Sequence, residues 1–244
     1  MDAKAYIGTS GWIYNHWKNT WYAGVPRKAW LQHMTERMTA LEANGTFYRL
    51  PTKESLAAWK EATPADFRFT MKAHRYLTHR KRLKDIAEGI GKQKEAAAGL
   101  GEKLSCVVWQ LPSNFKRNDE RLESFLEELK AWPETRHSIE LRHESWFVPE
   151  VADRLTEAGV AVCMSDAAGW PMWQAVTTDL VYVRLHGHHY TYWSNYSEAD
   201  LSWWADRVRL WLEEGREVHV YFDNDANSHA PYNAERLLAL VGGG

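Results

Sequence analysis

Five short segments of the chain alternate apolar residues with polar residues of types that perform chemistry. Successive side chains of a β-strand point to opposite faces, so the polar residues of each segment would share one face of a strand. These residues are Glu42 and Asn44, Lys72, Glu140 and Arg142, Arg184 and His186, and Tyr221 and Asp223. Carboxylates and histidine can transfer protons, while lysine and arginine can bind an anion. The five segments therefore predict a site that combines acid–base groups with cations.

The residue types suggest a division of roles within this site. The candidate catalytic residues are Glu42, Glu140 and His186. The candidate substrate-binding residues on the strands are Lys72, Arg142, Arg184, Asn44 and Asp223. We expect the three cations to form one cluster, because ammonium and guanidinium groups suit phosphate oxygens. The alternative is a buried ion-pair network that only supports the fold, since a buried charge needs a partner.

Strand-like and helix-like segments alternate along the whole chain. Strands are expected at 5–9, 39–44, 67–72, 104–111, 137–142, 160–165, 180–186 and 217–223. Strict alternation of strands with helices implies parallel strands and right-handed crossovers. Because no glycine-rich phosphate turn follows the first strand, we favour one (β/α)8 barrel of the TIM type over residues 1–244 rather than an open doubly wound sheet. Active sites of such barrels lie at the carboxyl ends of the strands, where the polar residues above converge.

The helical segments carry recognisable start and stop signals. Helices are expected at 28–38, 53–62, 119–131, 148–158, 198–214 and 232–241, with a long basic segment at 77–99 and a weakly helical connection at 167–175. Thr52, Asn118 and Ser197 are suited to cap the helices that follow them. Gly159 is suited to end the helix that precedes it.

Aromatic residues are dense in the loops expected at the same end of the barrel. The first loop, residues 10–25, is long and contains Trp12, and Trp146 and Trp170 also follow strands. Such side chains could stack on a base, a sugar or another planar group of a substrate. The alternative is that they pack the loops onto the rim of the barrel. Residues 74–82 are basic with an aromatic residue interleaved, which is a weak signal for nucleic acid; the alternative is the solvated face of a helix.

A metal site is conceivable but is not favoured by the sequence. His186 begins a histidine-rich stretch, and carboxylates at positions 42, 140 and 223 could add ligands. Three cations are expected in the same space, however, and they would repel a metal ion. We therefore expect no metal and no cofactor, and motifs for a serine nucleophile or a nucleotide phosphate loop do not occur in the sequence.

The composition is ordinary for a globular protein of 244 residues, with a net charge of −2. Neither a strongly basic character nor a long apolar run points to a membrane. The two cysteines, Cys106 and Cys163, lie far apart in apolar segments and are expected to be buried and unpaired. These features, together with an amino terminus unlike a signal peptide, lead us to expect a cytoplasmic protein. The oligomeric state is not indicated.

Several motifs together resemble the domain of unknown function 72 family, the YecE-like proteins. They are Ile7-Gly8-Thr9-Ser10-Gly11-Trp12, Glu42-Ala43-Asn44-Gly45-Thr46-Phe47-Tyr48, Lys72-Ala73-His74, Gln110-Leu111-Pro112, Glu140-Leu141-Arg142-His143-Glu144-Ser145-Trp146, Val183-Arg184-Leu185-His186-Gly187 and Tyr221-Phe222-Asp223-Asn224. The resemblance spans nearly the whole chain and implies a TIM-type barrel, but it implies no reaction. The chain departs from the family pattern at Ser113, where a second proline is expected, and at Asp223, where asparagine is expected.

Two functions are consistent with these observations. The first is an enzyme, a hydrolase of phosphate esters or phosphodiesters, acting on an anionic small molecule or a nucleic acid at the mouth of the barrel. The second is a barrel that binds a nucleotide or a nucleic acid without catalysis, through the basic segment 74–82 and the aromatic loops. Turnover of a phosphate ester would favour the first, and binding that weakens steeply with salt, without turnover, would favour the second.

Overall fold

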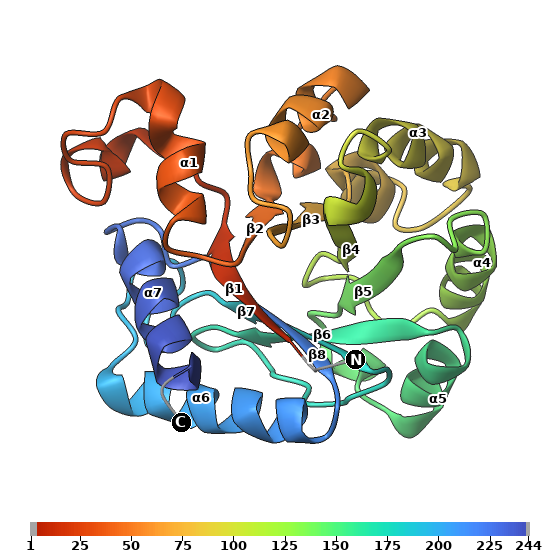
Figure 1. Cartoon of the computed structure of the whole chain (residues 1–244). Coiled ribbons are helices and arrows are strands. Elements are labelled where there is room, and N and C mark those ends of the chain that lie inside the picture. The colour runs from red at the N-terminus through yellow and green to blue at the C-terminus, as the bar shows by residue number, and fades with distance from the viewer. Residues whose placement is uncertain (1–3, 243–244) are drawn as a thin grey trace.

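The computed structural model describes residues 4–242, and its strands close into a barrel (Figure 1). The strands are β1 (Ala5–Ser10), β2 (Ala40–Ala43), β3 (Arg68–Lys72), β4 (Leu104–Gln110), β5 (Arg136–Glu140), β6 (Val160–Asp166), β7 (Leu180–Leu185) and β8 (Glu217–Phe222). Each strand pairs in parallel with the next, and β8 pairs with β1. The predicted parallel (β/α)8 barrel is therefore confirmed, and the open sheet is excluded.

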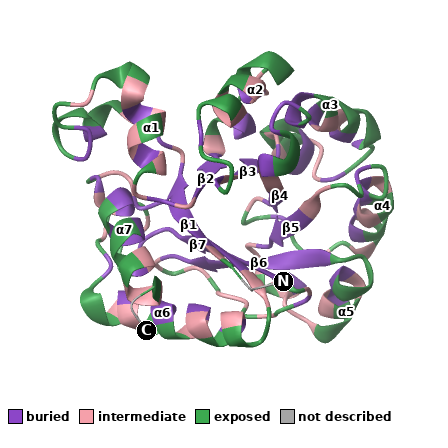
Figure 2. Cartoon of the chain, in the orientation of Figure 1, coloured by how far each residue is buried: buried purple, intermediate pink, exposed green. Residues whose placement is uncertain are grey.

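Helices surround the strands, as Figure 1 shows. They are α1 (Trp30–Thr35), α2 (Lys53–Glu61), α3 (Ala87–Ala97), α4 (Asp119–Leu129), α5 (Pro149–Glu157), α6 (Glu198–Glu213) and α7 (His229–Gly242). The strands are almost wholly buried, whereas the outer sides of the helices are exposed (Figure 2). Within the described residues, none of the helices combines the length and the apolar character needed to span a membrane.

The alternation of side chains along the strands divides the core into two parts. Outward residues such as Phe69, Ile139 and Val183 belong to the large apolar cluster that lies under the helices. Inward residues such as Cys106 and Tyr182 form a second, smaller cluster inside the barrel. Polar residues occupy the inward positions near the carboxyl ends of the strands, so the sequence pattern predicts the correct face.

The predicted helix signals have the expected local geometry. The side chains of Thr52 and Asn118 each accept a hydrogen bond from the backbone at the start of α2 and α4. Ser197 forms a reciprocal capping box with Asp200 at the start of α6. Gly159 has a φ of +67°, which is the left-handed conformation expected after the end of a helix.

The long helical segment expected at 77–99 is wrong as a single helix. Residues Tyr76–Arg80 form a π-helical turn, a loop follows, and α3 begins only at Ala87. Tertiary hydrogen bonds replace helical ones in this loop. Arg121 donates to the carbonyls of Lys81 and Arg82, and Glu128 accepts from the backbone amide of Ile86.

Two other connections also differ from the expectation. Residues 167–175 form no helix, and Trp173 of this segment stacks on Phe147. Helix α7 begins three residues earlier than expected, at His229. Pro231 lies in its first turn, where a helix tolerates proline because the missing amide would have no helical partner.

Cys106 and Cys163 are both buried and unpaired, as predicted. Burial raises the pKa of each thiol above its ordinary value. Each therefore behaves as a small apolar side chain inside the barrel.

Candidate functional site

Arg184 of β7 lies at the centre of a buried ion-pair network inside the barrel. Its Nη2 atom donates to Glu42 Oε1 at 2.8 Å and to Asp223 Oδ2 at 3.1 Å. Its Nη1 atom donates to Glu140 Oε2 at 2.8 Å, and its Nε atom donates to Glu42 Oε2 at 3.1 Å. One guanidinium group therefore binds three carboxylates that come from the ends of β2, β5 and β8.

The charges of this network stabilise one another. Burial alone would raise the pKa of Glu140, but the cations Arg142 and Arg184 outweigh burial and hold that pKa well below its ordinary value. Burial is likewise outweighed at Asp223, whose pKa falls to about 2, chiefly because of Arg184. Burial would lower the pKa of Arg184, but its carboxylate partners raise it. These three groups are therefore ionised at neutral pH.

The predicted cluster of three anion-binding cations needs a correction at Arg184. Its side chain is 0% exposed, and all three of its nitrogen atoms already donate to residues of the barrel. A ligand in the mouth cannot reach it. Arg184 instead fits the alternative prediction of a buried ion-pair network that supports the fold. Without this arginine, its carboxylate partners would be buried charges with no compensating cation.

His186 follows β7 and is also fully buried. Its Nε2 atom lies 3.2 Å from Arg184 Nη1, and its Nδ1 atom lies 3.0 Å from Asp223 Oδ2. Burial and the charge of Arg184 lower its pKa, so the ring is neutral at pH 7. The arginine can only donate, so Nε2 accepts and Nδ1 carries the proton. Nδ1 lies close to Asp223 but forms no hydrogen bond of normal geometry within the described residues. The side chain is 0% exposed, so a ligand in the mouth does not reach the ring in this arrangement, and the catalytic role of His186 stays a prediction.

Lys72, the last residue of β3, is the cation that the network leaves without a partner. Its side chain is 7% exposed, and its ammonium forms no hydrogen bond or ion pair within residues 4–242. The ammonium is not among the wholly buried atoms that lack a partner, so its tip keeps some contact with solvent. The ammonium lies 4.3 Å from the centre of the Phe47 ring. Burial and the charge of Arg184 lower the pKa of Lys72 to about 8. An unpaired buried ammonium is costly, so this lysine is suited to bind an anion.

Arg142, which follows β5, is the second cation near the mouth. Its Nε atom donates to Glu140 Oε1 at 2.6 Å, and its guanidinium carbon lies 3.8 Å from the centre of the Trp170 ring. Its Nη2 atom is buried without a partner in the described part of the chain. Glu140 and Trp170 thus hold the guanidinium of Arg142 in place, and its Nη2 edge is left without a hydrogen-bond acceptor in the described residues.

The charges of Lys72 and Arg142 also act on His79, which belongs to the basic segment 74–82. Burial, and after it the charges of Lys72 and Arg142, lower its pKa to about 4. Its ring packs edge-on against Phe47, and its Nδ1 atom lies 2.9 Å from Thr78 Oγ1. The ring is therefore neutral at pH 7 and could accept a proton. It lies on the π-helical turn, a feature often found at functional sites, which the sequence pattern did not reveal.

The three loop tryptophans expected to stack on a substrate have different positions. Trp146 is 0% exposed and donates from Nε1 to the carbonyl of Phe115 at 2.7 Å, so its expected role is wrong. It packs beneath the rim of the barrel. Trp12 is also buried but lies edge-on to Trp59 at 4.8 Å and lines a pocket beside the mouth. Trp170, which covers Arg142 and lies 4.9 Å from the His186 ring, is the tryptophan of the mouth itself.

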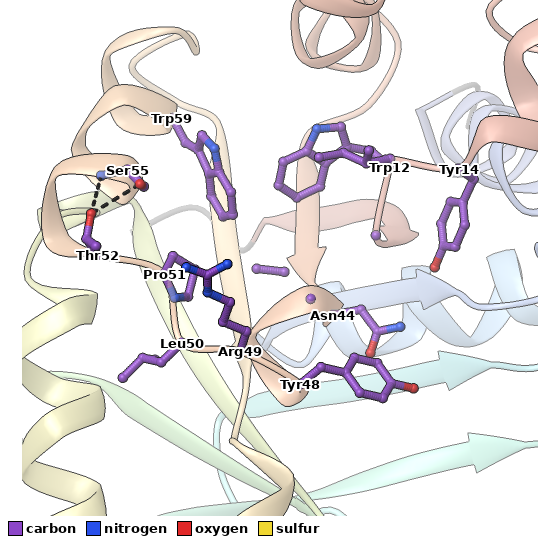
Figure 3. A pocket seen from close by; sticks show the side chains of 14 residues that line it. Trp12, Tyr14, Asn44, Tyr48, Arg49, Leu50, Pro51, Thr52, Ser55 and Trp59 are labelled. Carbon is purple, nitrogen blue, oxygen red and sulfur yellow. Dashed lines mark hydrogen bonds between the residues drawn. The ribbon is translucent and has the colours of Figure 1, made fainter.

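The pocket that Trp12 lines has a volume of about 760 Å³ (Figure 3). It is formed by the loop after β1, the turn after β2 and the start of α2. Asn44, a predicted substrate-binding residue, lies at its base, and the Oδ1 atom of Asn44 is buried without a partner among residues 4–242. The same residues contain no group of three histidine, cysteine or carboxylate side chains placed to hold a metal ion.

The fold and the mouth define a parallel (β/α)8 barrel whose open end is lined by ion-paired and unpaired charges. A family model described as "Protein of unknown function DUF72" matches residues 6–244. The chain therefore belongs to this family, as the sequence motifs indicated.

Relatives and solved structures agree with this assignment. The UPF0759 protein YecE of Escherichia coli (strain K12) is 26% identical over 156 residues, which are 64% of this chain and 54% of YecE, so the match spans about half of that relative. The UPF0759 protein YunF of Bacillus subtilis (strain 168) is 20% identical and is matched over 97% of this chain and 94% of its own length. The crystal structure of a DUF72 family protein from Thermotoga maritima has a TM-score of 0.87 with 27% identity, covering 98% of this chain and 99% of that one.

Proposed function

We propose that the mouth of the barrel binds the phosphate group of a phosphate ester or phosphodiester and hydrolyses it. The observation that carries this proposal is the largely desolvated ammonium of Lys72, which forms no hydrogen bond or ion pair within residues 4–242 and whose tip remains accessible. Arg142 adds a fixed guanidinium with an unsatisfied buried nitrogen. A phosphate group bound between the two side chains would accept hydrogen bonds from both. It would thereby offset the desolvation of the Lys72 ammonium and the unsatisfied nitrogen of Arg142, because charged hydrogen bonds to phosphate are strong.

In this proposal three residues act on the substrate. Lys72 and Arg142 bind the phosphate oxygens. The negative charge of the bound phosphate raises the pKa of His79, so that His79 can accept a proton from a water molecule. The water oxygen forms a bond to phosphorus while the bond from phosphorus to the leaving oxygen breaks. Lys72 then gives its proton to the leaving oxygen. The buried network of Glu42, Glu140 and Arg184 positions Arg142 and supports the mouth from below.

Turnover can be tested with p-nitrophenyl phosphate, bis(p-nitrophenyl) phosphate and nucleoside monophosphates. We expect release of p-nitrophenol or phosphate from at least one of them, and a fall in kcat/KM of about 100-fold to 1,000-fold in Lys72→Met. Lys103→Met is the matched control. Its ammonium is also buried, but it donates to the backbone carbonyls of Lys60 and Thr63, so its loss should leave kcat/KM unchanged. Equal rates in Lys72→Met and the wild type would overturn the proposal.

Anion binding should depend on pH through Lys72. Because the pKa of Lys72 is about 8, its ammonium loses its charge as the pH rises above that value. We expect the affinity for sulfate, which remains a dianion throughout, to be constant below pH 7 and to fall about tenfold between pH 8.5 and 9.5. Calorimetric titration of sulfate across this range measures the effect. A sulfate affinity that does not change up to pH 10 would exclude Lys72 as the anion ligand.

A barrel that binds nucleic acid without catalysis remains the second candidate. The observation in its favour is the exposed basic segment around the π-helical turn, where Tyr76 is 52% exposed between Arg75 and Lys81. If this function is correct, the protein binds a single-stranded oligonucleotide with an affinity that falls steeply as the salt concentration rises. It then turns over no phosphate ester. Arg75→Gln would then weaken the binding without changing sulfate affinity at the mouth.

A further inference from the structure

The pocket beside the mouth has the size of a small-molecule site. Its volume of about 760 Å³ lies within the usual range of such sites, which is about 300–1,000 Å³. The loop after β1 contributes Trp12 and Tyr14, and the segment from β2 into α2 contributes the opposite wall. In Figure 3, Trp12 and Trp59 lie at one end of the pocket, and Asn44 lies between Tyr14 and Tyr48 at the other.

The lining of this pocket is largely aromatic and apolar, and it also includes the exposed cation Arg49 (Figure 3). Trp12, Trp59 and Tyr48 contribute rings, and Tyr48 is 64% exposed. Thr52 and Ser55 already bond to one another at the start of α2. Asn44 Oδ1 is the buried acceptor that has no partner in the described residues. A sugar ring presents several hydroxyl groups that each need a partner when buried, whereas a nucleobase presents a flat apolar face and a few polar edge atoms.

One short turn separates the pocket from the cation of the mouth. Asn44 and Gly45, at the start of the 3₁₀ turn Asn44–Phe47, line the pocket. Phe47, at its end, contacts the ammonium of Lys72. The hydroxyl of Thr46 donates to the carbonyls of Ala43 and Lys72, both at 2.6 Å, which fixes the turn to β2 and β3. A single ligand could therefore place a ring on one side of the turn and an anion on the other.

We propose that this pocket holds the base of the substrate, so that the substrate is a nucleoside phosphate. The position of the phosphate rests on the function proposed for the mouth, whereas the position of the base rests on the pocket alone. The base stacks against the tryptophan end of the pocket, and Asn44 meets its polar edge. The preference of the protein for nucleoside phosphates over other phosphate esters originates in this pocket.

Binding of four probes tests this proposal, namely adenosine, adenosine monophosphate, glucose 6-phosphate and inorganic phosphate. We expect adenosine monophosphate to bind at least about tenfold more tightly than either of the other two phosphates, since stacking of one base contributes that much. Trp59→Leu should remove this advantage and leave the affinity for inorganic phosphate unchanged. Trp203→Leu is the control, because Trp203 lies on α6, is 45% exposed and is absent from this pocket. Tyr48→Ala, at an exposed position, should weaken adenosine monophosphate binding if Trp59→Leu does not fold.

The outcomes separate the pocket from the mouth. Adenosine should bind equally to the wild type and to Lys72→Met, because it carries no phosphate. If adenosine binds and inorganic phosphate does not, the proposed function fails and the base site stands. If phosphate binds but adenosine monophosphate binds no more tightly than glucose 6-phosphate, the base site is overturned and the proposed function stands.

Discussion

Replacing Arg184 with methionine is expected to lower the free energy of unfolding by about 3–5 kcal/mol. The arginine is fully buried and donates to Glu42, Glu140 and Asp223, so its loss leaves three carboxylates without their shared cation. Methionine fills a similar volume but cannot donate. Urea denaturation of the variant and of the wild type at pH 7 measures the difference.

A surface ion pair provides the control for Arg184→Met. Arg236 of α7 pairs with Glu198, and both side chains are about half exposed. Arg236→Met should leave the urea midpoint nearly unchanged, because exposed ion pairs contribute little. If Arg184→Met were as stable as Arg236→Met, the network would not be the element that supports the mouth.

Replacing Lys72 with methionine is expected to have the opposite effect on stability while it weakens anion binding. The pKa of Lys72 falls from 10.5 to about 8, and each pKa unit corresponds to about 1.4 kcal/mol. The buried ammonium therefore destabilises the folded state at neutral pH, and we expect Lys72→Met to gain about 1–3 kcal/mol. Calorimetric titration should show that its affinity for sulfate falls about 10-fold to 100-fold, because charged hydrogen bonds are lost.

The stability gained in Lys72→Met should depend on pH in a defined way. Between pH 8 and 10.5 the unfolded chain binds the lysine proton and the folded chain does not, so the stability of the wild type rises with pH in this window. The free energy of unfolding of Lys72→Met should therefore exceed that of the wild type by a constant amount below pH 8. This excess should vanish near pH 10.5. Lys103→Met should be destabilised instead, because the carbonyls of Lys60 and Thr63 lose their donor. A loss of stability in Lys72→Met would mean that the ammonium has a partner in solution.

The strand pattern predicts the fold and the direction of the polar side chains well, because both follow from local alternation. Glu140 and Arg184 point into the barrel as the period of two requires. The pattern does not predict how deeply each side chain is buried or which residues it pairs with. Arg184 and Lys72 both point inward near the carboxyl ends of their strands, yet one donates to three carboxylates and the other to none within residues 4–242. That difference arises from the packing of distant strands.

Loop residues were predicted less well for a related reason. An aromatic residue after a strand can point into the mouth or beneath the rim, and both directions bury it. Trp146 bonds to the carbonyl of Phe115 beneath the rim, whereas Trp170 covers Arg142 in the mouth. His79 belongs to the basic segment 74–82, and the π-helical turn holds its ring near enough to Lys72 and Arg142 for their charges to lower its pKa. No local sequence signal predicts the direction of these tryptophan side chains or the position of the His79 ring.

The reach of Arg184 across the barrel also has a consequence for how the chain folds. Its guanidinium belongs to β7, but its partners come from β1, β2, β5 and the end of β8. A partly assembled barrel that lacks either end of the chain would contain carboxylates without their cation or a cation without its carboxylates. Half-barrel intermediates are thereby disfavoured, and assembly becomes more nearly all-or-none. The same charges that shape the mouth thus couple the first strand to the last during folding.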